Sequence, residues 1–109
     1  METNWTKDEL KAYLFLFAAH ANFEESKAEL NFIKTRVGAK NLAHIHDEFD
    51  KDNDYQRIQK IEATIERYAY EKEDIENLLL DVKALFIADG ELDILEESLF
   101  LGLRHLLLS

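Results

Sequence analysis

The chain has 109 residues, with 23 acidic and 13 basic side chains and a formal net charge of −10. This length is typical of one domain with a single core, so residues 1–109 are expected to form one unit. The negative charge repels phosphate backbones and argues against nucleic-acid binding. It suits a soluble acidic surface, and alternatively the binding of cations or of a basic protein partner.

Several absences narrow the class of protein further. There is no cysteine, no apolar run near the roughly 18 residues of a membrane span, and no secretory signal in "METNWTKDEL". We therefore expect a cytoplasmic protein without disulfides or membrane insertion. Proline, the strongest helix breaker, is also absent, and β-branched residues are few. This composition predicts an all-α fold, a compact bundle of about six helices.

The first two predicted helices each open with a Ser/Thr-x-x-Glu capping box. The first helix should span about 7–21 and the second about 27–37, because apolar residues recur there at helical spacing. Gly38 is placed to end the second helix. The two capping pairs are Thr6 with Glu9 and Ser26 with Glu29.

A shorter third helix is predicted over 40–49, and a fourth follows the Asp/Asn-rich segment 50–54. That segment resembles the start of an EF-hand calcium loop. However, Tyr55 stands where the loop needs glycine, and Ile61 stands where it needs glutamate. We interpret the segment as the cap of the fourth helix, whose positive end favours carboxylates.

The fifth helix is predicted over 72–88 and the sixth after residue 93. The broad apolar face of the fifth helix places it near the middle of the bundle. Gly102 inside the sixth helix costs about 1 kcal/mol relative to alanine, and a close helix contact would explain it. Trp5 should pack ahead of the first helix. Three tyrosines have the spacing of core-edge residues, namely Tyr55, Tyr68 and Tyr70.

The connection between the last two helices, "ADGELDILEE" (88–97), holds five carboxylates. Asp93 and Glu96 have a structural explanation as a helix cap and its partner. Asp89 ends the fifth helix, where a negative charge opposes the helix dipole, and Gly90 allows a tight turn. Such oxygen ligands suit a hard cation, Ca²⁺ or Mg²⁺. A solvated turn in which the aspartate bonds its own backbone is the alternative.

The two ends of the chain show a weak internal repeat. A shift of 67 residues aligns Glu29 with Glu96, whereas a shift of 69 aligns His20 with Asp89. Both registers remain open. In either register, the first two helices correspond to the last two, which predicts a duplicated helical hairpin.

The segment "LLLDVKALFIADGELDILEESLFLGLRHLL" resembles the closing hairpin of the TerB-like family, the tellurite-resistance protein B domain. That family has an apolar helix ending in Ala-Asp-Gly, an apolar residue two positions later, and a glutamate opening the next helix. The matching positions are Ala88, Asp89, Gly90, Leu92 and Glu96. The family repeats the hairpin near its N-terminus, where this chain has "LFAAHANFEESKAELNFIKTRVG". There, Ala21 or Phe23 replaces the expected glycine, and His20 or Asn22 replaces the expected aspartate.

The resemblance implies a single TerB-like helical domain that acts as a binding module in a stress response to metal or oxyanion. It also implies divalent-cation ligands at Asp89, Glu91, Asp93, Glu96, Asn22 and Glu29. The alternative is a metal-independent interaction domain whose acidic face meets a basic protein partner.

No catalytic function is expected from the sequence. It contains no Gly-rich phosphate loop and no Gly-x-Ser-x-Gly elbow. Zinc is not expected either, because His44 and His46 are two positions apart and do not share a helix face. We expect these histidines at the surface.

Overall fold

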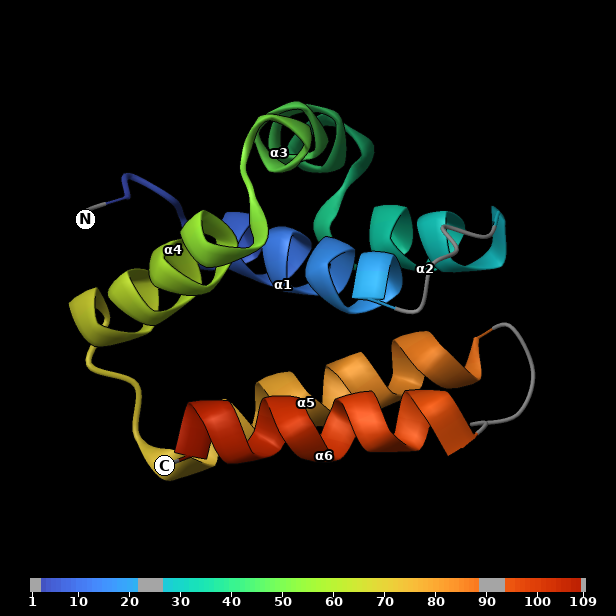
Figure 1. The fold of residues 1–109 in the computed structure, drawn as a ribbon. Coiled ribbons are helices and arrows are strands. Elements are labelled where there is room, and N and C mark those ends of the chain that lie inside the picture. Colours follow the sequence, from blue (N-terminus) through green and yellow to red (C-terminus); the bar gives the residue numbers. More distant parts are fainter. Residues whose placement is uncertain (1–2, 22–26, 89–93, 109) are drawn as a thin grey trace.

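The structure, a computed structural model, describes residues 3–21, 27–88 and 94–108. These residues form six α-helices and no strand, which confirms the predicted all-α fold (Figure 1). None of these six helices, within the described part of the chain, is long and apolar enough to cross a membrane. The helices are α1 (Lys7–Ala21), α2 (Lys27–Val37), α3 (Ala39–Lys51), α4 (Asp54–Arg67), α5 (Lys72–Ile87) and α6 (Ile94–Leu108).

Local sequence signals explain most of these helix bounds. Thr6 and Glu9 form the predicted capping box, in which each side chain accepts the other residue's backbone N–H, at 2.9 and 3.1 Å. Gly38 adopts φ +89°, a left-handed backbone angle that interrupts the helix. Therefore α2 ends directly before Gly38, and α3 begins directly after it. The expectation of a short third helix was wrong: α3 has 13 residues against 11 in α2.

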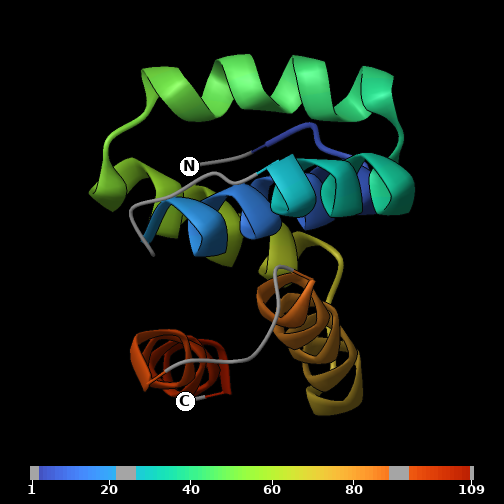
Figure 2. The ribbon, with the colours of Figure 1, turned by 90° about the vertical axis from the view of Figure 1, so that its right-hand side faces the viewer.

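The central helix is α1, not α5 as the sequence suggested. Figures 1 and 2 show α1 in a middle layer, with α3 on one side and α5 and α6 on the other. It packs against all five other helices. Five consecutive α1 residues are buried, whereas α5 leaves Leu80 62% exposed. A helix that is apolar on all sides must be buried in the interior. A helix with one broad apolar face, such as α5, can leave its other face in water. The five residues are Ala12, Tyr13, Leu14, Phe15 and Leu16.

The segment before α1 is fixed to the bundle by an aromatic anchor. Trp5 is buried, as predicted, with its ring centroid 4.4 Å from that of Tyr13. Its indole N–H donates to Glu48, and its carbonyl accepts the Tyr68 hydroxyl at 2.7 Å. Tyr55 was expected to pack at the core edge, and that prediction was wrong, because it is 70% exposed.

Gly102 was expected to allow a close helix contact, but nothing lies within 4 Å of a β-carbon added there. We therefore expect Gly102→Ala to raise the free energy of unfolding by about 0.5–1 kcal/mol, because alanine is the better helix former. Chemical denaturation measures the change. Gly38→Ala is the matched control and should destabilise, because its positive φ disfavours a side chain. A loss of stability in Gly102→Ala would contradict the open space at this position.

Candidate functional site

Two of the six predicted metal ligands lie within the described residues, and both are buried. Glu29 is 2% exposed and Glu96 is 5% exposed. Each lies in the first turn of its helix, α2 or α6. The N-terminal ends of these two helices lie at the same end of the bundle, on the right in Figure 1. The other four, Asn22, Asp89, Glu91 and Asp93, lie outside the described residues.

Burial of a carboxylate is costly unless its charge is compensated. The first turn of a helix provides part of that compensation, because its partial positive charge favours anions. Glu29 and Glu96 are 67 positions apart, and each opens the second helix of a packed pair, α1–α2 or α5–α6. Within residues 3–21, 27–88 and 94–108, no group of three or more histidine, aspartate or glutamate side chains could hold a metal ion.

The Asp/Asn-rich segment 50–54 caps helices, as the sequence predicted. The Asn53 side chain accepts the backbone N–H of Gln56 at 2.8 Å, and the Gln56 side chain accepts that of Asn53 at 2.9 Å. Asp54 forms an ion pair with Arg57 at 3.1 Å. The segment therefore has local roles that account for its polar side chains without calcium.

A partly buried polar network joins the segment before α1 to α1, α3 and α4. Asp52 accepts a hydrogen bond from the Tyr13 hydroxyl at 2.7 Å and from Lys60 Nζ at 2.7 Å. Lys60 also donates to Glu48 at 3.0 Å, and Glu48 accepts the Trp5 indole N–H at 3.1 Å. No motif or spacing in the sequence relates the members of this network to one another. Both carboxylates of the network, those of Asp52 and Glu48, are paired with groups of the protein itself. We therefore assign the network a structural role.

The network shifts the titration of two of its members. Burial and the hydrogen bond to Asp52 raise the pKa of Tyr13 well above its usual value. Burial lowers the pKa of Lys60, but its hydrogen bonds to Asp52 and Glu48 outweigh that effect, and the net change is upward. Both groups are therefore protonated at neutral pH.

These shifts predict a loss of stability in alkaline solution. Both folded-state pKa values lie above the unfolded values of about 10 for tyrosine and 10.4 for lysine. The stability that these two groups contribute is fully present below about pH 10. It is lost as the pH rises further, because the unfolded chain then holds fewer protons than the folded protein. Tyr13→Phe should reduce this pH dependence in denaturation measured from pH 8 to 11. The control Tyr55→Phe should retain the pH dependence of the wild type. If the free energy of unfolding fell equally steeply with pH in the wild type and both variants, Tyr13 would not be the source of the alkaline loss.

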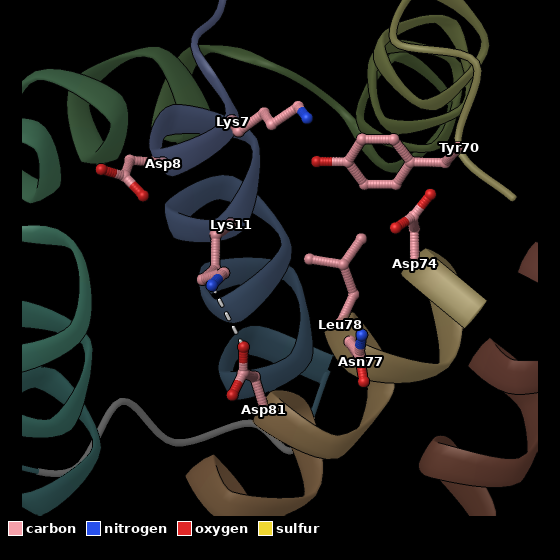
Figure 3. A pocket seen from close by; sticks show the side chains of 8 residues that line it. All are labelled: Lys7, Asp8, Lys11, Tyr70, Asp74, Asn77, Leu78 and Asp81. Atoms are coloured by element: carbon pink, nitrogen blue, oxygen red, sulfur yellow. Dashed lines mark ion pairs between the residues drawn. The ribbon is translucent and has the colours of Figure 1, made fainter.

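A polar pocket of about 340 Å³ lies between α1 and α5 (Figure 3). Lys11 and Asp81 form an ion pair across it at 3.2 Å, and Asp81 also contacts Arg36 at 3.4 Å. The Lys7 ammonium lies over the Tyr70 ring, 5.6 Å from the centroid. The pocket wall therefore carries both basic and acidic groups, and the Lys11–Asp81 ion pair joins α1 to α5. We assign no ligand to it.

Comparison of the chain with protein-family models, curated proteins and solved structures finds no match. The TerB-like resemblance therefore depends on the sequence motif alone. Three of the five motif positions, Asp89, Gly90 and Leu92, lie outside the described residues. Glu96, which opens α6 in that motif, is described and buried.

Proposed function

We propose that the chain is a non-enzymatic acidic helical module that binds a divalent cation, Ca²⁺ or Mg²⁺, where α2 and α6 begin. The observation that supports this most is the burial of Glu29 and Glu96 at equivalent positions of two packed helix pairs. It favours the 67-residue register and a duplicated hairpin. In the sequence, these helix starts adjoin four further proposed ligands, Asn22, Asp89, Glu91 and Asp93.

The chemistry of these side chains suits a hard cation. Ca²⁺ takes six to eight oxygen ligands, and Mg²⁺ takes six with several waters retained. Each buried glutamate supplies up to two oxygens, and the flanking acids can supply more. The net charge of −10 also raises the local concentration of cations. Together with the TerB-like resemblance, these features support a cytoplasmic role in the response to metal or oxyanion stress.

Neutralising the buried glutamates should remove the response to metal. In thermal melts, a cation at 100 times its dissociation constant should stabilise the wild type by about 2.7 kcal/mol relative to chelator. Glu29→Gln and Glu96→Gln should lose most of that stabilisation. Glu97→Gln is the matched control, because Glu97 lies in the same turn of α6 but is exposed. Equal metal responses in Glu96→Gln and Glu97→Gln would remove Glu96 from the ligand set.

A metal-independent interaction domain is the second candidate function. Three large apolar side chains on α5 and α6 are well exposed, namely Leu80 (62%), Ile94 (85%) and Leu101 (56%). Exposed apolar side chains on an acidic chain are features of a surface that meets a basic protein partner. A wild type whose melting temperature is unchanged by Ca²⁺ and Mg²⁺ would favour this function.

A further inference from the structure

The face of α6 that points away from the bundle carries a row of apolar side chains. Ile94 is 85% exposed and Leu101 is 56% exposed. They are seven positions apart, which places them on one face of the helix, and the partly buried Leu108 ends the same row. The buried residues of α6 lie on the opposite face, namely Glu96, Leu103 and Leu107.

The neighbouring helix α5 adds apolar side chains beside this row. Leu80 and Ile87 are 62% and 46% exposed, and they too are seven positions apart. The ion pair between Arg104 and Glu76, at 3.0 Å, shows how the antiparallel helices α5 and α6 lie alongside each other (Figure 1). From that pair, Leu80 lies one turn further along α5, and Leu101 lies one turn further back along α6. These two exposed side chains therefore lie at about the same level of the α5–α6 hairpin.

The sequence of α6 is complementary to itself about Leu101. When a second copy of α6 is laid antiparallel with Leu101 opposite Leu101, Ile94 lies opposite Leu108, because each is seven positions from the centre. To one side of this row, Glu97 of each copy faces Arg104 of the other. Glu97 is exposed, and the Arg104 side chain is 42% exposed, so both are accessible to a second copy. The antiparallel arrangement therefore joins apolar to apolar and acid to base at the same time.

A parallel arrangement of the two copies lacks this complementarity. It places Glu97 opposite Glu97 and Arg104 opposite Arg104, and it also aligns the two helix dipoles. The net charge of −10 opposes the association of like chains. We therefore expect pairing in concentrated protein and a monomer in dilute solution.

We propose that this surface binds a second copy of the chain, with α6 antiparallel to α6 about a twofold axis at Leu101. The apolar row and the exposed α5 side chains form the centre of the contact, and two Glu97–Arg104 pairs flank it. This interface goes beyond the proposed cation site and requires no metal.

The test is sedimentation velocity of the full chain in chelator, at concentrations up to about 1 mM, the Kd of a very weak association. We expect a reversible monomer–dimer equilibrium. Leu101→Glu should weaken it at least tenfold, because two carboxylates then oppose each other on the axis. Tyr55→Glu is the matched control, since it makes the same charge change at an exposed residue of α4, and it should dimerise like the wild type.

An exchange of charges tests the antiparallel register. Glu97→Arg and Arg104→Glu should each weaken the dimer severalfold, because like charges then face each other, and the double variant should recover most of the loss. Circular dichroism establishes folding for each variant. A wild type that is monomeric at 1 mM would overturn the proposal, as would equal dimerisation of Leu101→Glu and Tyr55→Glu. A double variant no better than the single variants would overturn the antiparallel pairing.

Discussion

Phe15→Ala is expected to lower the free energy of unfolding by about 3–5 kcal/mol, because it leaves a cavity at the centre of the bundle. Phe15 is fully buried in α1, the helix that contacts all the others. Its ring meets Phe32 of α2 edge-on, with centroids 5.7 Å apart. Urea denaturation followed by circular dichroism measures the change.

Two substitutions in α5 calibrate this result. Leu80→Ala removes a side chain that is 62% exposed and should have little effect. Leu79→Ala removes a side chain that is 1% exposed and should cost about 2–5 kcal/mol. If Leu79→Ala were more damaging than Phe15→Ala, α5 would be the centre of the bundle, as the sequence suggested.

Lys60→Met is expected to destabilise the protein by about 2–4 kcal/mol. The substitution removes the only cation that contacts both Asp52 and Glu48 within the described part of the chain. It leaves two neighbouring carboxylates in a partly buried position, and their repulsion and lost hydrogen bonds are unfavourable. Equilibrium denaturation at pH 7 measures the effect, since Lys60 is charged there.

The matched control is Lys51→Met, which breaks an exposed ion pair with Asp47 whose two side chains are each 74% exposed. Such surface pairs contribute little to stability. In the double variant of Lys60→Met with Asp52→Asn, part of the loss should be recovered, because one uncompensated charge is removed. Equal effects of Lys60→Met and Lys51→Met would show that the network does not stabilise the fold.

The helices were predictable because their signals are local. Capping residues, a chain-reversing glycine and apolar spacing all act within a few positions of a helix end. The second capping box, at Ser26 and Glu29, predicted the start of α2 at Lys27. The length of α3 was harder to predict: the helix begins one residue earlier than expected, directly after Gly38, and ends two residues later, at Lys51.

The apolar faces of the helices alone do not predict which helix is the most buried. Both α1 and α5 are rich in apolar residues, and which one is central depends on how the other helices pack around them. Arg57 is a similar case. It lies in the stretch that resembles a calcium loop, yet it is buried, donates to the Phe49 carbonyl and lies over the Phe49 ring at 3.8 Å. Those contacts depend on the angle between α3 and α4.

The candidate site was predictable only in part. The capping pattern placed Glu29 and Glu96 in first turns, but their burial depends on neighbouring helices. The polar network joins positions as distant as Tyr13 and Asp52, with no sequence signal that relates them. An apolar groove of about 280 Å³ likewise arises where α6 lies beside α1 and α5.

The most direct test of cation binding is an amide NMR titration of the wild-type chain, first cleared of metal with chelator, with Ca²⁺ and then with Mg²⁺. The account predicts saturable shifts concentrated in two segments, 27–30 and 88–97. These segments contain the first turns of α2 and α6 and the acidic connection before α6. An absence of shifts there, or unsaturated shifts spread over exposed acids such as Glu62 and Glu66 of α4, would contradict a specific cation site.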